Sequence, residues 1–177
     1  MKTLYIVAHP DLSTSMATNI IRSEIEKSKD SDYLLIWDDG PKYNTSAVEC
    51  YQALLLEADI IILQFPLYWS HFPACLKSFI DNVFTEGFAF GKDDNCHQLK
   101  DKKVILSTTA GATKDSYKYG GFNHHCYEYY FNAMVAPFRS AKMRIEKPFI
   151  TYEVTKESAM THAEDLIKYV ECLTKSN

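Results

Sequence analysis

One stretch constrains the fold of this chain more than any other: residues 58–91, ADIIILQFPLYWSHFPACLKSFIDNVFTEGFAFG. It begins with a short apolar run rich in β-branched residues, Ile60 to Phe65, and this length is typical of a strand buried on both faces. After Pro66, apolar residues recur every three or four positions from Phe72 to Phe84, which indicates an amphipathic helix. The loop between them, PLYWSHFP, follows the carboxyl end of the predicted strand, where open α/β sheets bind ligands. This loop is therefore the first candidate site.

The rest of the chain alternates predicted strands with predicted helices. The other strands are expected at Thr3–Ala8, Tyr33–Trp37, Lys103–Ser107 and within Met143–Val154. In the last of these, Pro148 requires an edge position, a bulge or a break, because proline has no N–H for the ladder. Strands separated by helices predict a parallel sheet covered on both faces. We therefore expect a single α/β domain over residues 1–177, a flavodoxin-like three-layer sandwich with a five-stranded parallel sheet in the order 2-1-3-4-5.

The predicted helices follow the same apolar periodicity. They contain Ile20 to Ile25, Val48 to Ala58, Tyr127 to Met134 and Glu157 to Leu173. Thr45 or Ser46 is the expected N-cap of the second helix. In the last helix, the apolar stripe leaves His162 on the predicted outer face, where we expect it to be solvated.

Composition argues against several classes of function. A net charge of -4 without clustered lysine and arginine argues against a nucleic-acid partner. Five widely spaced cysteines without a CxxC pair favour neither a disulfide framework nor a zinc site, and a reducing cytoplasm fits them best. No run approaches the roughly 18 apolar residues of a membrane span, and the amino-terminal segment does not resemble a signal peptide. A soluble, cytoplasmic protein is therefore expected.

Three loops should meet at the carboxyl edge of the predicted sheet. The first, HPDLSTS, offers hydroxyl groups where a helix start favours an anion, although Ser13 or Ser15 could serve only as a helix cap. The second is PLYWSHFP, and the third, TTAGATKDSYKYGG, is rich in small residues. Together they suit a ligand with a phosphate tail and a flat ring, such as flavin mononucleotide. The first strand carries neither a GxGxxG nor a P-loop pattern, and a GxSxG elbow is absent.

The motifs of this chain resemble, in order, those of the flavin-dependent NAD(P)H quinone oxidoreductases. They are AHPDLSTSMATN, QFPLYWSHFPACLKSFIDNVF, GFAFG and TTAGATKDSYKYGGFNH. That family includes small bacterial ancillary subunits of potassium-efflux systems. The resemblance implies a homodimer that binds FMN or FAD and reduces quinones by two electrons with NADH or NADPH. FMN is expected rather than FAD, because the short chain leaves little material for an adenosine site.

The resemblance also implies which residues contact the flavin. The phosphate would lie against His9, Ser15, Met16, Ala17 and Thr18. The wall of the ring would be formed by Pro66, Leu67, Tyr68 and Trp69. The pyrimidine end of the ring would be reached by Thr108, Thr109, Ala110, Gly111 and Ala112. Ala110 stands where the family has a glycine, and this permits close backbone approach only if the position needs no positive φ.

The catalytic groups implied by the resemblance lie in the third loop. Tyr117 matches the family tyrosine that, with a downstream histidine, stabilises the negative charge of reduced flavin. The family histidine falls at Asn123, and His124 is the next residue, so either is a candidate partner of Tyr117. The aromatic residues in 127–131 exceed what one helix face can bury, which favours a dimer contact.

Two other functions stay open from the sequence. A flavodoxin-type electron carrier would bind flavin without oxidising pyridine nucleotides, and it usually has a far more acidic surface. A regulatory subunit would associate peripherally with a membrane transporter, for which the sequence offers no docking motif.

Overall fold

The computed structural model of the protein describes residues 1–27, 31–37 and 42–175. Its centre is a parallel sheet with the strand order β2-β1-β3-β4-β5, and a sixth strand within the described residues also pairs with β4. The strands are β1 (Thr3–Ala8), β2 (Ser31–Ile36), β3 (Ile60–Pro66), β4 (Lys103–Thr109), β5 (Arg144–Ile145) and β6 (Phe149–Thr151). This topology confirms the predicted flavodoxin-like α/β fold.

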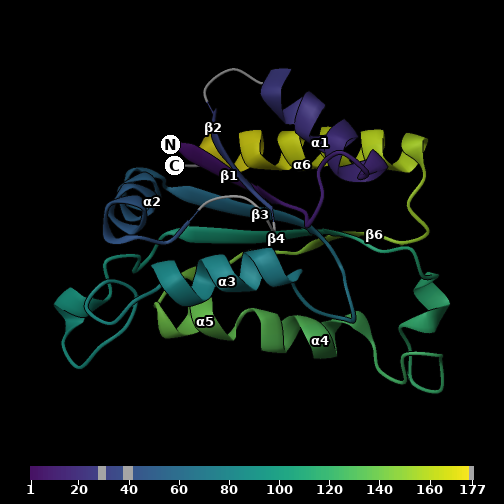
Figure 1. Cartoon of the computed structure of the whole chain (residues 1–177). Helices are drawn as coiled ribbons and strands as arrows, with labels where there is room; N and C mark the ends of the chain where they lie inside the picture. Colours follow the sequence, from purple (N-terminus) through teal and green to yellow (C-terminus); the bar gives the residue numbers. More distant parts are fainter. Residues whose placement is uncertain (28–30, 38–41, 176–177) are drawn as a thin grey trace.

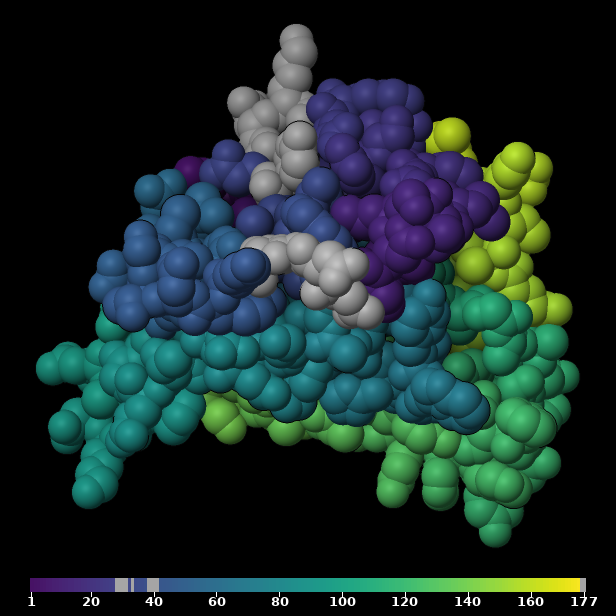
Figure 2. Space-filling model, viewed as in Figure 1, coloured from purple at the N-terminus to yellow at the C-terminus, as the bar shows by residue number. Residues whose placement is uncertain are grey.

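Helices cover both faces of the sheet and make three layers (Figure 1). One face carries α1 (Met16–Lys27) and α6 (Lys156–Lys175), which pack against each other. The other face carries α2 (Thr45–Glu57), α3 (Ala74–Val83), α4 (Tyr127–Met134) and α5 (Ala136–Ser140). The loop between α3 and β4 and the loop between β4 and α4 project beyond the body on this second side, in teal and green (Figure 2).

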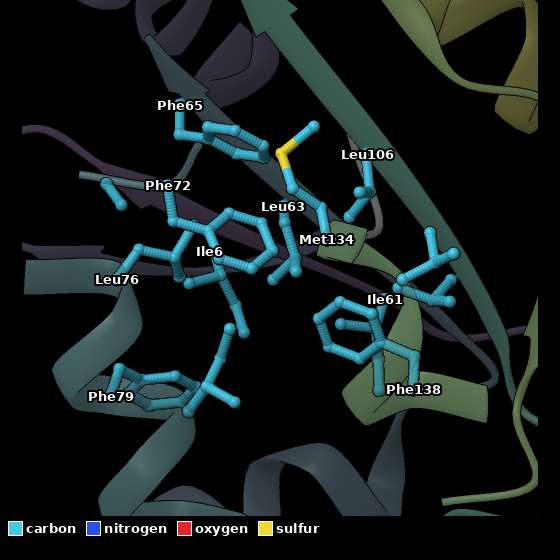
Figure 3. Packing of buried hydrophobic residues seen from close by; sticks show 14 of the residues in the cluster. Ile6, Ile61, Leu63, Phe65, Phe72, Leu76, Phe79, Leu106, Met134 and Phe138 are labelled. Atoms are coloured by element: carbon cyan, nitrogen blue, oxygen red, sulfur yellow. The ribbon is translucent and has the colours of Figure 1, made fainter. Parts of the chain in front are cut away.

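Each face of the sheet has its own apolar core. The core beneath α2 to α5 is the larger, and there Phe72, Phe79 and Phe138 pack on the apolar residues of β1, β3 and β4 (Figure 3). The second core lies between the sheet and the α1–α6 pair, and it includes Ile21 and Leu166. β3 is buried along its whole length, as its continuous apolar run predicts.

The predicted fifth strand is two short strands, because Pro148 interrupts it. β5 pairs with the start of β4, where Lys103 lies opposite Arg144, and β6 pairs with its end, where Ser107 lies opposite Phe149. The break at Pro148 that the sequence predicts is therefore confirmed. Its effect is to give the carboxyl half of β4 a partner of its own.

Two helix starts differ from the prediction. The N-cap of α2 is Asn44, whose side-chain oxygen accepts a hydrogen bond of 2.9 Å from the Ala47 N–H, so neither Thr45 nor Ser46 fills that role. Residues 38–41 of the preceding predicted loop lie outside the described residues. α3 begins at Ala74, two residues beyond Phe72, because a residue that precedes proline is disfavoured in the helical conformation.

The predicted exposure of His162 is wrong. This residue is 5% exposed and shares the buried stripe of α6 with Ala159, Ala163, Leu166 and Val170. The protein tolerates this burial because both ring nitrogens lie within hydrogen-bonding distance of hydroxyl groups, those of Ser107 and Thr151. α6 and the other helices of the described residues are too short or too polar to cross a membrane.

Candidate functional site

A hollow of about 260 Å³ opens at the carboxyl ends of β1, β3 and β4, and we call it the rim hollow. It is lined by His9, Ser15, Met16, Ala17, Thr18, Pro66, Leu67, Tyr68, Thr109, Gly111 and Val154. All of these except Val154 are residues that the sequence predicts as cofactor contacts. A larger hollow of about 600 Å³ lies beside α3 and α5, and none of the predicted site residues lines it.

The start of α1 forms one side of the rim hollow. Ser15 is buried, and its hydroxyl oxygen accepts a hydrogen bond of 3.2 Å from the Thr18 N–H, so this residue caps the helix and also lines the hollow. The Thr18 hydroxyl is buried and has no hydrogen-bond partner among the described residues. Free N–H groups and the helix dipole at such a terminus favour an anion. The start of α1 therefore fits a phosphate group.

The preceding loop is held together by Asp11. Its carboxylate accepts hydrogen bonds from the backbone N–H and the hydroxyl of Ser13, at 2.9 and 2.6 Å. These bonds keep the pKa of the Asp11 carboxyl below its usual value. Because the Thr14 hydroxyl also bonds within the loop, to the Asp11 carbonyl, Ser13 and Thr14 stabilise the turn and do not line the rim hollow.

His9 joins the first loop to the loop after β3. Its Nδ1 accepts a hydrogen bond of 3.1 Å from the Asp11 N–H, so the neutral ring carries its proton on Nε2. Nε2 lies 3.0 Å from the Tyr68 hydroxyl and donates to that oxygen. The hydroxyl hydrogen of Tyr68 is thereby left for another acceptor, and both side chains line the rim hollow.

The loop after β3 ends in a tight turn. Tyr68 and His71 pair through their backbones, with N–H to carbonyl distances of 3.1 and 2.9 Å. Trp69 and Ser70 between them have φ values of 49° and 60°, which costs energy for residues other than glycine and often marks a functional segment. The turn exposes Trp69 completely, so this predicted ring contact lies outside the lining of the rim hollow.

The loop after β4 brings only part of its predicted residues to the rim hollow. Thr109 and Gly111 line it, whereas Thr108, Ala110 and Ala112 do not. Thr108 is fully buried, and its hydroxyl lies 3.4 Å from the Phe149 carbonyl. Ala110 has no positive φ, so an alanine can stand without strain where the family has a glycine. The Thr109 carbonyl accepts a hydrogen bond of 2.8 Å from the Leu67 N–H and so joins the loops after β3 and β4.

Val154 is the lining residue that the sequence does not predict. It follows β6, and its N–H donates to the Ala110 carbonyl at 3.2 Å. Only the pairing of β6 with the end of β4 brings it there. The sequence signal that could have indicated Val154 is the apolar segment after Pro148, which pairs with the end of β4.

Tyr117 lies under the turn after β3. It is 9% exposed, and its ring packs against Tyr130 and Tyr152 at centroid distances of 6.1 and 5.5 Å. Burial raises the pKa of the Tyr117 hydroxyl, and a hydrogen bond with the Ser70 side chain opposes this effect. The phenol is therefore protonated at neutral pH and is anchored to the turn that contains Trp69.

Asn123 and His124 are placed differently from Tyr117. The Asn123 backbone is fixed at both ends, since its N–H donates to the Ser116 carbonyl at 2.9 Å and its carbonyl accepts from the Tyr130 hydroxyl. His124 is exposed and has a φ of 62°. Neither side chain, nor that of Tyr117, lines the rim hollow.

A family model described as a flavodoxin-like fold matches residues 1–173. The chain belongs to this family. Among relatives of this flavodoxin-like protein, an uncharacterized NAD(P)H oxidoreductase of Bacillus subtilis (strain 168), YrkL, is 32% identical over 177 residues, which cover 96% of this chain and 98% of YrkL. The family assignment made from the sequence motifs is confirmed.

Two further comparisons extend this result. The glutathione-regulated potassium-efflux system ancillary protein KefG of Salmonella paratyphi B is 29% identical over 178 residues, 97% of this chain and 92% of KefG. The solved structure of an NADPH-quinone reductase from P. pentosaceus superimposes with a TM-score of 0.82 at 27% identity, covering 96% of this chain and 97% of that protein. Both likenesses span nearly the whole flavodoxin-like protein.

Proposed function

We propose that this protein is a flavin-dependent NAD(P)H:quinone oxidoreductase. The observation that carries the proposal is the rim hollow, where three loops place the start of α1 beside an aromatic turn. At that helix start, the buried Thr18 hydroxyl has no hydrogen-bond partner in the part of the chain that the structure describes. Relatives of the chain support the reaction class, since one is named an NAD(P)H oxidoreductase and one an NADPH-quinone reductase.

The proposed cofactor is FMN. The start of α1 would hold its phosphate through free N–H groups and the Thr18 hydroxyl. Gly111 would let the cofactor approach the backbone, since a side chain there would meet no protein atom within 4 Å. When bound, FMN accepts a hydride from NADH or NADPH and passes two electrons to a quinone.

The protein supplies orientation and hydrogen-bond donors. His9 fixes the Tyr68 hydroxyl so that its hydrogen points to an acceptor other than His9. The remaining wall of the ring would be formed by Pro66 and Leu67, which are buried, while Trp69 would border the open side of the site. Tyr117, with Asn123 or His124, would stabilise negative charge at the far end of the ring.

Purified protein tests the proposal directly. We expect a yellow protein that binds FMN with one equivalent per chain and consumes NADH or NADPH when a quinone is added. FMN binding without NAD(P)H consumption would instead indicate a flavodoxin-type electron carrier. A colourless protein that takes up neither FMN nor FAD would refute the proposal.

The proposed assembly is a homodimer formed through the face of α3, α4 and α5. The two projecting loops flank this face and make it concave (Figure 2). Exposed aromatic side chains occur on or next to it, namely Phe90, Tyr119, Phe122 and Tyr129. A closed two-fold dimer would bury them. Light scattering at micromolar concentration should give twice the mass of the 20.3 kDa chain, and a monomer would contradict the assembly without affecting the proposed reaction.

A second candidate function is that of a cytoplasmic ancillary subunit that associates with a potassium-efflux transporter in the membrane. The likeness to KefG favours it, and it is compatible with flavin binding. Co-purification of the full-length chain with the membrane fraction only when the transporter is expressed would support it. Unchanged distribution in that experiment would leave the protein as a free cytoplasmic enzyme.

A further inference from the structure

His162 ties two strands together beneath the rim hollow. From α6, its Nε2 lies 2.6 Å from the Ser107 hydroxyl on β4, and its Nδ1 lies 2.8 Å from the Thr151 hydroxyl at the end of β6. The imidazole is buried against the ring of Phe149. A single side chain thus bridges the two strands at the carboxyl end of the sheet.

The hydrogen bonds of this bridge have a defined direction. The Ser107 hydroxyl donates its one hydrogen to the side-chain oxygen of Gln64 at 2.5 Å. Ser107 must therefore accept from His162, so Nε2 carries the ring proton and Nδ1 accepts from the Thr151 hydroxyl. These hydrogen bonds form one polar chain, which consists of Thr151 on β6, His162 on α6, Ser107 on β4 and Gln64 on β3. This pattern of donors and acceptors requires a neutral His162 imidazole.

The β6 end of this chain is joined to the rim hollow by the backbone. Thr151 lies opposite Thr109, which lines the hollow. The Thr151 carbonyl accepts a hydrogen bond of 2.8 Å from the Ala110 N–H, and two residues on, the Glu153 N–H donates to the Ala112 carbonyl at 3.2 Å. The segment 109–112 is therefore held in place by β6, and the Thr151 side chain connects β6 to His162.

The polar chain is costly for the core that contains it. Its neighbours on this face include Ile62, Ile105 and Ala163, and the Gln64 amide nitrogen has no hydrogen-bond partner among the described residues. An unsatisfied buried group of this kind destabilises the folded state. Aliphatic side chains would fill the same space at lower cost but would not add directional bonds from α6 to both β4 and β6 to the backbone pairing of these strands. Placement of β6 is the property that the polar chain adds.

We propose that His162 is a positioning residue for cofactor binding: by bridging Ser107 and Thr151 it holds β6 so that Thr109 and Gly111 form one wall of the rim hollow. The proposal rests on the proposed function, because it takes FMN as the ligand of that hollow. It adds a residue that does not touch the hollow and that the sequence motifs do not indicate.

The test measures the FMN dissociation constant of the refolded apoprotein and its variants well below their melting temperatures. Thr151→Val removes the hydroxyl at nearly constant shape and leaves the bond between His162 and Ser107. Thr151→Ser retains the hydroxyl. The matched control is Thr161→Val, which removes an exposed hydroxyl of α6 that bonds only to the Glu157 carbonyl, at 3.2 Å.

We expect Thr151→Val to raise the dissociation constant for FMN about tenfold, the scale of losing an outer partner of a binding group. Thr151→Ser should stay within about twofold of the wild type, and Thr161→Val should be unchanged. A lower melting temperature of Thr151→Val with wild-type FMN affinity would reduce the bridge to a stabilising role and overturn the inference. Wild-type protein that binds no FMN would overturn the proposed function as well, so the two failures are distinguishable.

Discussion

The Tyr68 hydroxyl lies 3.0 Å from Nε2 of His9, across 59 positions of the sequence. Because the Asp11 N–H occupies the other ring nitrogen of His9, the imidazole acts as a donor towards Tyr68. The pair therefore locks the loops after β1 and β3 together and aims one phenol hydrogen away from the imidazole.

Substitution of Tyr68 tests this arrangement. Tyr68→Phe should raise the FMN dissociation constant about fivefold, which corresponds to the loss of about 1 kcal/mol from one hydrogen bond. Titration of apoprotein by flavin fluorescence measures the effect. Tyr169→Phe is the matched control, because it removes a hydroxyl of α6 that bonds to the Glu146 carboxylate at 3.1 Å and does not line the rim hollow. Equal affinity of Tyr68→Phe and wild type would show that the hydroxyl has no part in binding.

Tyr117 should affect turnover rather than cofactor retention. Tyr117→Phe keeps the packing against Tyr130 and Tyr152 but removes the hydroxyl donor. We expect turnover with a quinone to fall about 100-fold, the effect of removing one preorganised donor. Bound FMN per chain should be unchanged. Tyr169→Phe, on α6 and outside the rim hollow, is the control. A Tyr117→Phe enzyme with wild-type turnover would remove Tyr117 from the mechanism.

Two glycine substitutions should have opposite effects. Gly111→Ala fits the fold, because the position has no positive φ and the new methyl group meets no atom within 4 Å, but the methyl group projects at the rim hollow. It should weaken FMN binding with little change in stability. Gly87 has a φ of +84°, so Gly87→Ala should lower the free energy of unfolding by about 1 kcal/mol and leave FMN affinity unchanged. Thermal unfolding and FMN titration of both variants separate these outcomes, and a Gly111→Ala protein with normal affinity would argue against ligand contact there.

Stability should depend on pH through His162. Burial lowers the pKa of its imidazole from 6.5 to about 4, while the Asp165 carboxylate acts weakly in the opposite direction. Between these values the unfolded chain binds more protons than the folded protein, so this group makes the free energy of unfolding rise with pH. Its contribution is complete above about pH 6.5, and about 3 kcal/mol of it is lost as the pH falls to 4.

Urea unfolding of wild type and His162→Gln between pH 4 and pH 7 measures this contribution as the difference between two profiles. The profile of the variant should be flatter across this window, since glutamine does not titrate. Parallel profiles would mean that the folded protein accepts a proton on His162 without cost.

The elements of this fold follow from short-range patterns. The strand β1 and the helix α4 coincide with their predicted bounds, because continuous apolar runs and helical periodicity are local properties. The rim hollow could be predicted for the same reason, since parallel strands bring successive loops to one edge. The break at Pro148 follows from the chemistry of a single residue.

Other features depend on contacts that no local pattern contains. His162 looks like a surface residue because histidine is polar, and its two partners are 55 and 11 positions away. Trp69 could be assigned to the correct loop, but its exposure depends on the positive φ values of the turn. Val154 reaches the rim hollow only through the register of β6 with β4.

The interruption at Pro148 also limits how copies of this protein can meet. An uninterrupted outer strand would present a row of free backbone groups on which a second sheet could grow. Here that outer border consists of β5, two residues long, and β6, three residues long, with a proline between them. Such a border is a poor template for intermolecular sheet extension and protects against aggregation. At this edge of the sheet, association between copies by strand pairing is thereby disfavoured.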